Sequence, residues 1–596
     1  MQSPHQPEQK NLLLAIGLSL VILLSYHYLV EKPKLTAMEA QRQAIAQQQT
    51  NAPTAAPITT SESKEEKLLE RADALAQSPR IQIKTPSVTG TLNLRGARFD
   101  DLELSRYPQD MDSPVPVSLL SPANTVSPYY IEQGWLGENI KTPNANSIWQ
   151  ADKDVLSPGA PVTLRWNNGD GLTFIKTISV DENYLFTIEQ RIENQSARTV
   201  TMYPFARIFM QHKNSQVQTA KTDMASPLVL RGLLGVLGGE YQSATFDKLS
   251  EKSDQTEETQ TFNGQGGWLG ITDKYWFTAL IPDQTATIDA RFVRTGTAPL
   301  TGMWPFRHID HTHDGRDFQA DYRAAARTIE PGAQSTYTSH FFAGAKEMRV
   351  LDTYEQSPGI PRFDLAVDFG WFYLITKPFF YMLTWLGQVI GNFGWAIILF
   401  TIVVRAAMFP LTAQSQKSMQ RMKDVAPKMK ELQARYKDDP TKLQGEMMQF
   451  YRKEKINPMA GCLPMLIQIP VFFALYKVLY ITIEMRHAEF FGFLRDLSVA
   501  DPSNIFNLFG IIPWDPPSVM HLGILPILMG LTSWLQMKLA PAPTDEMQKQ
   551  IFSIMPWFLM IMLAGLPAGL LLYWVTSNIL AIGQQWWIKR NMTPAN

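Results

Sequence analysis

The feature that most constrains this chain is a series of long apolar segments. Residues 12–30 (LLLAIGLSLVILLSYHYLV) carry no charge and have the length that crosses ~30 Å of hydrocarbon. We predict an uncleaved anchor here; a cleaved signal peptide is the alternative, although no small-residue cleavage pattern follows directly. Further spans are predicted in the C-terminal part, at approximately 389–409, 462–483, 522–537, 551–566 and 568–588.

Two features of the sequence predict how many membrane spans there are and how they are oriented in the membrane. Gly565, Pro567 and Gly569 interrupt the last apolar stretch, so it is predicted to form two helices joined by a tight turn. The loop between Leu411 and Pro458 contains eleven basic and six acidic residues, and short basic loops stay in the cytoplasm. Helix parity then places both termini in the cytoplasm and residues 31–387 outside.

The outer part has a different composition. Residues 36–77 are rich in Ala, Gln, Thr and Ser, which predicts a flexible tether with a short helix at 64–76. Segments such as RIQIKTPSVTGTLNLRGARF then alternate with period two between turn residues, which predicts an antiparallel β-sandwich.

These features predict a polytopic α-helical membrane protein, with an N-terminal anchor and a five-helix core bundle, that carries a large all-β outer domain. The predicted parts are the cytoplasmic N-terminus 1–10, the anchor 11–30, the tether 31–79, the β-domain 80–360, an aromatic-rich segment 361–388, a transmembrane helix 389–410, a cytoplasmic helical hairpin 411–458, a transmembrane helix 459–484, an outer loop 485–520, a transmembrane helix 521–538, a cytoplasmic loop 539–550, two transmembrane helices 551–588 and a short cytoplasmic tail 589–596.

The outer domain offers little catalytic chemistry. His308, His311 and His313 could supply imidazoles to zinc, but ligands crowded into one short loop favour a solvated turn, so we predict no metal. GLLGVLGG at 232–239 lacks the lysine of a phosphate-binding loop and is interpreted as an apolar hairpin tip. Cys462 is the only cysteine, so no internal disulfide can form. A formal net charge of −1 gives no reason to expect a nucleic-acid partner.

Arg405 is the one charge in the apolar run ILFTIVVRAAMFP. Since it lies five residues before Pro410, roughly 7–8 Å of helix, the guanidinium could reach the cytoplasmic surface. Thr401 shares its helix face, and polar residues interrupt other predicted helices, which favours a hydrated interior instead. These other polar residues are Gln468, Thr532, Ser533, Gln536, Tyr573, Trp574, Thr576, Ser577 and Asn578. No pair of acids accompanies them, which argues against an ion-coupled transporter.

The cytoplasmic hairpin is basic outside and apolar along one seam. Its three–four spacing predicts two packed helices, whose Met-rich seam and basic exterior suit apolar segments and ribosomal RNA. The seam residues are Met422, Val425, Met429, Leu432, Tyr436, Leu443, Met447, Phe450 and Tyr451.

Three motifs together resemble a known family. Together with the large outer β-domain, the Arg405 helix ending in FPLT, then NPMAGCLPMLIQIPVFFALYKVL and then GLPAGLLLYWVTSN are similar, in this order along the chain, to the YidC membrane protein insertases (YidC/Oxa/Alb) of Gram-negative bacteria, and the likeness covers essentially the whole chain. The resemblance implies a non-enzymatic insertase and chaperone of the bacterial inner membrane, without a cofactor. It also implies a periplasmic super-sandwich like that of sugar mutarotases, and an interfacial helix at 361–388 whose amphipathic part, 363–383, lies on the outer membrane surface.

The resemblance further implies a hydrophilic groove open to the cytoplasm and to lipid. Arg405 and Thr401 are expected to line it, and Gln468, Ser577 and Asn578 to contribute. Many relatives have tyrosine at the position of Trp574, whereas this chain has the pair Tyr573-Trp574. An apolar surface beside the groove, along which the client's helix would slide into lipid, is predicted from Phe472, Phe473, Leu475, Met560 and Met562.

The expected partners follow from this resemblance. They are nascent membrane proteins, the Sec translocon with its accessory subunits, the lipid bilayer, and the ribosome through the basic hairpin, but not DNA. The short ending KRNMTPAN differs from the long basic tails of some members. The alternatives from other classes are a small-solute transporter or channel, and a membrane-tethered periplasmic enzyme.

Overall fold

The structure is a computed structural model that describes residues 69–211, 229–250, 258–295, 317–370, 372–436, 439–454, 463–512, 514, 516, 522–539 and 546–591. All of these residues belong to one compact unit, Glu66–Asn596. The predicted anchor, most of the tether, Cys462 and the histidines at 308, 311 and 313 lie outside the described residues.

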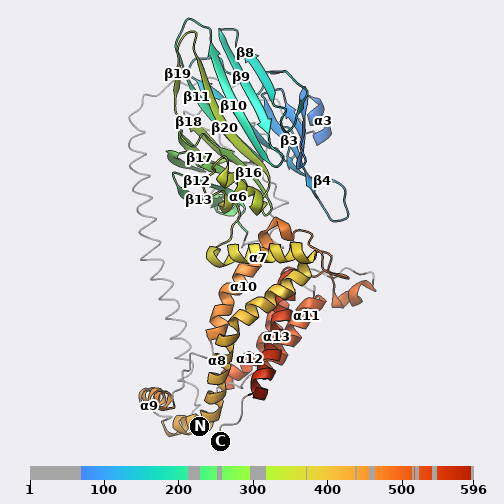
Figure 1. The fold of residues 1–596 in the computed structure, drawn as a ribbon, viewed down its shortest axis with the longest axis vertical. Helices are drawn as coiled ribbons and strands as arrows, with labels where there is room; N and C mark the ends of the chain where they lie inside the picture. The colour runs from blue at the N-terminus through green and yellow to red at the C-terminus, as the bar shows by residue number, and fades with distance from the viewer. Residues whose placement is uncertain are drawn as a thin grey trace, which may run out of the picture. The chain divides into compact units, whose positions relative to one another are not determined.

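Two β-sheets form the N-terminal part of this unit (Figure 1). The described residues contribute eleven strands to the first sheet, with β14-β17-β18-β11-β5-β3-β2-β1-β7 in order, β19 beside β11 and β4 beside β3. Their bounds are β1 Arg80–Lys84, β2 Val88–Asn93, β3 Arg98–Pro108, β4 Pro116–Leu120, β5 Tyr129–Gly137, β7 Val155–Leu156, β11 Val200–Gln211, β14 Glu258–Gln265, β17 Thr287–Thr295, β18 Asp317–Ala324 and β19 Arg327–Ile329.

Within the same described ranges the second sheet has nine strands, in the order β13-β12-β15-β16-β20-β10-β9-β8-β6. Neighbouring strands pair antiparallel, as the sequence predicts, except for the parallel pair of β1 with the two-residue β7. The bounds are β6 Gln150–Ala151, β8 Val162–Asn167, β9 Leu172–Val180, β10 Leu185–Asn194, β12 Gly232–Leu237, β13 Glu240–Thr245, β15 Trp268–Thr272, β16 Trp276–Ile281 and β20 Gln334–Ala345.

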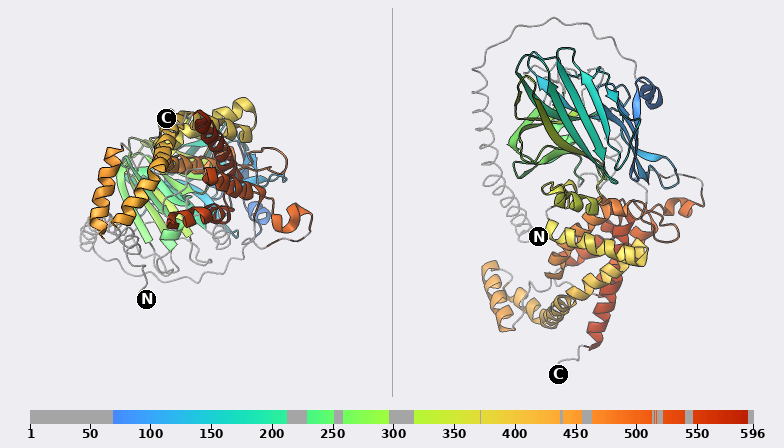
Figure 2. Two further views of the ribbon diagram at one scale, coloured as in Figure 1. Left: turned by 90° about the horizontal axis from the view of Figure 1, so that it is seen from below. Right: turned by 45° about the horizontal axis from the view of Figure 1, so that its top comes forward.

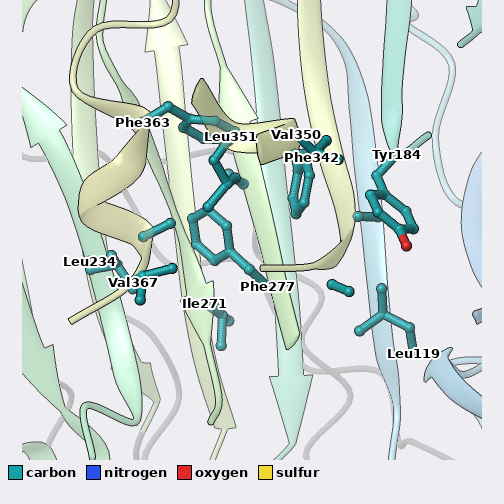
Figure 3. Packing of buried hydrophobic residues seen from close by; sticks show 14 of the residues in the cluster. Leu119, Tyr184, Leu234, Ile271, Phe277, Phe342, Val350, Leu351, Phe363 and Val367 are labelled. Atoms are coloured by element: carbon teal, nitrogen blue, oxygen red, sulfur yellow. The ribbon is translucent and has the colours of Figure 1, made fainter. Parts of the chain in front are cut away.

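The outer domain is β-rich rather than all-β, because short helices complete its core. These are α3 (Arg71–Ala76), α5 (Phe246–Ser250), α6 (Met348–Gln356) and the 3-10 helix η3 (Phe363–Ala366). Figure 3 shows Val350 and Leu351 of α6 and Phe363 of η3 against the rings of Phe277 and Phe342 from the second sheet. The Phe342 and Phe363 rings meet edge to face, with centroids 5.5 Å apart.

The predicted interfacial helix at 361–388 is therefore wrong at its N-terminal end. Phe363 is fully buried in the core of the β-domain, and the helix that follows, α7, spans Tyr373–Ile390. Gly370 separates the two with a φ of 69°, a left-handed conformation that ends regular structure and suits glycine. The sequence shows one continuous aromatic-rich stretch, so its division between two packing environments is not visible there.

The interpretation of GLLGVLGG at 232–239 as a hairpin tip is also wrong. Its first six residues form the buried strand β12. β12 lies between β13 and β15, and all its residues are buried. A strand covered on both faces has no polar alternation, so its sequence is a continuous apolar run. The turn itself is Gly238–Gly239, where both φ values are positive.

The C-terminal part is helical. Its further helices are α8 Phe393–Arg435, α9 Pro440–Lys453, α10 Leu463–Ile481, α11 Ile524–Leu539, α12 Glu546–Met562 and α13 Ala568–Asn591. In the described part of the chain, only the Phe393–Ser418 portion of α8 is both long and apolar enough to cross a membrane on its own. Shorter apolar helices lie at Gln468–Ile481, Ile524–Leu539 and Gln550–Met562, so the number of spans stays a prediction.

The predicted transmembrane helix 389–410 is wrong at its C-terminal end, because α8 does not end at Pro410. It continues through Pro410 and Pro427 to Arg435, because a proline removes one backbone hydrogen bond while the Ala-, Gln-, Met- and Lys-rich sequence on either side favours helix. Figure 2 shows α9 beside the C-terminal part of α8. Val425 and Met429 of α8 pack there against Met447, Phe450 and Tyr451.

Candidate functional site

The site is built around Arg405, whose guanidinium reaches from α8 to α13. Its Nε donates to Ser577 Oγ at 2.8 Å, and the side chain is half-buried. No carboxylate forms an ion pair with Arg405 among the residues that the structure describes. Within the described residues the cation is therefore held by a neutral hydroxyl, and no carboxylate there compensates its charge.

Two more helices join α13 through polar side chains. Gln468 of α10 donates its amide to Tyr573 Oη at 2.5 Å. Asn578 donates to Thr532 Oγ1 at 3.1 Å and to Ser533 Oγ at 2.9 Å, both on α11. Tyr573 and Ser577 are four residues apart on α13, so one face of this helix connects α10 and α8.

These contacts combine into a polar cluster inside an otherwise apolar bundle, and Figure 1 shows the four helices that contribute to it. The structure brings together five of the predicted site residues there, Arg405, Gln468, Tyr573, Ser577 and Asn578. Thr532 and Ser533 belong to the same cluster but were not among the predicted site residues, although their polarity within an apolar helix is visible in the sequence. Polar groups buried among apolar helices are stable only when they bond to one another or to water.

Thr401 and Trp574 lie apart from this hydrogen bonding. Thr401 is fully buried and donates to the carbonyl of Ile397 at 2.6 Å, within its own helix. The ring of Trp574 meets Phe472 edge to face at 5.0 Å, on the apolar side of α13. The aromatic hydroxyl in the cluster therefore comes from Tyr573 and not from position 574.

The predicted apolar surface is only partly exposed. Phe473 is 41% exposed and Met562 is 42% exposed, whereas Leu475 is completely buried. Leu475 is therefore a core residue of the bundle, and its inclusion in this surface is wrong. Phe472 and Met560 are half-buried, and Met560 packs beside Gly530 of α11. Ile469 is exposed on α10, one turn before Phe473, and was missed.

An apolar helical bundle with a buried polar cluster, joined to a β-rich domain, defines a helical membrane protein with a large extramembrane domain. The family model described as 60Kd inner membrane protein matches residues 385–595, and the YidC periplasmic domain model matches residues 80–382.

Curated relatives match along the whole chain. The membrane protein insertase YidC of Methylorubrum extorquens (strain PA1) is 43% identical over 98% of this chain and 95% of its own length. The protein of the same name from Beijerinckia indica subsp. indica is 43% identical over 97% and 95%. A solved structure of an active YidC insertase is 18% identical, covers 86% of this chain and 95% of its own, and has a TM-score of 0.34. The chain belongs to the YidC membrane protein insertase family, an inner-membrane family with a periplasmic domain.

Proposed function

We propose that the chain inserts nascent proteins into the bacterial inner membrane and assists their folding, alone or with the Sec translocon. The observation that carries this proposal is the uncompensated guanidinium of Arg405 within the polar cluster of α8, α10, α11 and α13. The names of the curated relatives support the same function.

The proposed reaction is an exchange of hydrogen-bond partners. A carboxylate attracts the guanidinium by its opposite charge and can accept two parallel hydrogen bonds from it, which a neutral hydroxyl cannot, so a carboxylate of the client can displace Ser577 from Arg405. A polar client segment then enters the cluster instead of crossing bare hydrocarbon, which shortens the apolar barrier that it must pass. No nucleotide is needed, since burial of the client's apolar surface and the membrane potential supply the driving force.

The client's apolar helix would leave along the exposed side of α10. Ile469 and Phe473 lie one turn apart there, and Phe472 and Trp574 border the cluster. We propose this edge as the route into lipid, with Met562 of α12 as a further contact. Multi-pass topology with cytoplasmic termini, and contact of the basic hairpin with the ribosome, belong to the same proposal.

Photocrosslinking along α10 tests the route. A photoreactive amino acid at Gln468 or Phe473 should capture a short nascent membrane protein during its synthesis, because both side chains border the proposed path. The same amino acid at Leu475 is the matched control on the same helix, since that side chain is fully buried. Equal capture at all three positions, or none at Gln468 and Phe473, would contradict the route.

A further inference from the structure

The segment between α10 and α11 exposes a compact group of large apolar side chains. Six large apolar residues between 506 and 514 are exposed, and we call them the apolar tip: Phe506, Leu508, Phe509, Ile511, Ile512 and Trp514. Ile511 is 80% exposed, and Leu508 and Phe509 are each more than half exposed. The sequence from Ser503 to Trp514 contains no charged residue. Soluble surfaces rarely leave such a contiguous patch uncovered.

The base of this segment is fixed to the helical bundle. Asp501 is fully buried and accepts from the backbone N–H of Leu525 at 2.7 Å, while Ser503 Oγ accepts from Ile524 at 2.9 Å. The residues just before it bond to the start of α13, where Ala568 N donates to the carbonyl of Val499 at 2.7 Å. The apolar tip is therefore held at a set distance from the N-terminal end of α11.

The backbone of the tip turns its side chains outward. Leu508 and Phe509 have φ values of 51° and 59°, in the left-handed region that bulky residues rarely adopt. Backbone bonds hold this turn, since Phe509 N donates to Asn504 O at 2.8 Å and Ile512 N donates to Asn507 O at 3.0 Å. The exposure is thus built into the turn.

The neighbouring surface indicates what covers the tip. Leu528, Leu531 and Leu535 of α11 are exposed at helical spacing, so they form an apolar stripe on the helix that follows the tip in the sequence. In a membrane protein such a stripe faces lipid. A tryptophan at the end of an uncharged apolar segment is also typical of the membrane–water interface.

We propose that the apolar tip inserts into the outer leaflet of the bilayer and anchors the periplasmic end of α11 at the boundary between headgroups and acyl chains. The segment predicted as an outer loop at 485–520 is then partly a membrane-embedded element. Amphipathic elements of this kind lie about 5–10 Å below the interface. The choice of the outer leaflet rests on the multi-pass topology proposed above, whereas insertion of the tip into lipid does not depend on insertase activity.

Fluorescence of labelled full-length protein tests the depth of the tip. With Cys462 replaced by serine, Phe509→Cys and Ile511→Cys would each carry an environment-sensitive fluorophore in vesicles of phosphatidylethanolamine and phosphatidylglycerol. Val126→Cys, exposed on the β-domain, is the aqueous reference. We expect blue-shifted emission at positions 509 and 511 and quenching of this emission by spin-labelled lipids. A spin label near the headgroup should quench it more strongly than one near the end of the acyl chain.

Two results would overturn the proposal. One is fluorophore emission at positions 509 and 511 that has the same wavelength as at Val126→Cys and is not quenched by spin-labelled lipids. The other is blue-shifted emission that spin-labelled lipids do not quench. It would mean that a second copy of the chain or another protein covers the tip. Hydroxyl-radical footprinting of the unsubstituted chain gives an independent reading, with protection of the peptide 503–514 expected in vesicles.

Discussion

Glu132 of β5 shows at the scale of one residue how the β-domain holds buried charge. Its carboxylate accepts from Arg98 Nε and from Arg207 Nε, each at 2.6 Å. Burial alone would raise its pKa, but the two guanidinium groups outweigh burial and lower the pKa of Glu132 to about 2. The unfolded chain therefore binds a proton at a higher pH than the native domain does.

Two consequences follow for Glu132. Its contribution to stability is complete above the ordinary pKa of about 4.5 and is lost as the pH falls toward about 2. Glu132→Gln leaves two buried guanidinium groups without their carboxylate and should lower the free energy of unfolding by about 3–5 kcal/mol at pH 7. Urea unfolding at pH 7 and at pH 3 measures the free energy of unfolding of the parent and of Glu132→Gln. The difference between the two proteins should be smaller at pH 3 than at pH 7. A difference in the free energy of unfolding that is the same at both pH values would contradict this account.

The polar cluster shows which site residues the sequence can predict. Arg405, Gln468 and Ser577 are recognisable because a polar group in an apolar helix needs a partner, and the other helices supply one. The burial of Leu475 was not predictable, since α10 is apolar on every side and no periodicity marks the face that packs inward. Exposure along such a helix depends on its neighbours.

At the scale of elements, β12 depends on glycine where its backbone meets the next strand. A Cβ added to Gly235 would lie 2.5 Å from the carbonyl oxygen of Trp268, a backbone atom that cannot move aside. Gly235→Ala should therefore lower the free energy of unfolding by roughly 1–3 kcal/mol.

Gly445→Ala is the matched control for Gly235→Ala. Apart from the adjacent backbone of α9 itself, no described atom lies within 4 Å of the added methyl group, so this change should stabilise the helix by about 1 kcal/mol. Thermal unfolding followed by circular dichroism compares the two variants. An unchanged unfolding temperature for Gly235→Ala would show that β12 and β15 can separate to admit the methyl group.

Sequence patterns predict elements better than their boundaries. The alternating strands and α10 to α13 follow from period and length, and the break before α13 follows from Pro567. The continuation of α8 beyond Pro410 and the separation of η3 from α7 depend on tertiary packing, which overrides local signals.

At the scale of the whole molecule, the polar cluster uses residues of the helical part alone. Removal of residues 80–366 deletes the β-domain together with η3 and leaves α7 to α13 intact. We expect the shortened protein to retain most of its insertion activity, because no cluster residue is lost. Insertion of a short client into vesicles, compared with the full chain at matched protein levels, measures this. Complete loss of activity would instead favour an enzymatic or client-binding role of the β-domain.

The central claim is that the charge of Arg405 serves the client, and a charge exchange tests it most directly. Purified protein with Arg405→Glu would be assayed in vesicles without a membrane potential, with a client that has one aspartate in its translocated segment. We predict that insertion falls roughly tenfold or more, as loss of one charge-assisted hydrogen bond implies. Arg405→Lys should retain more activity, and a client with lysine in place of the aspartate should recover insertion by Arg405→Glu. Equal insertion of both clients by both proteins would contradict the account.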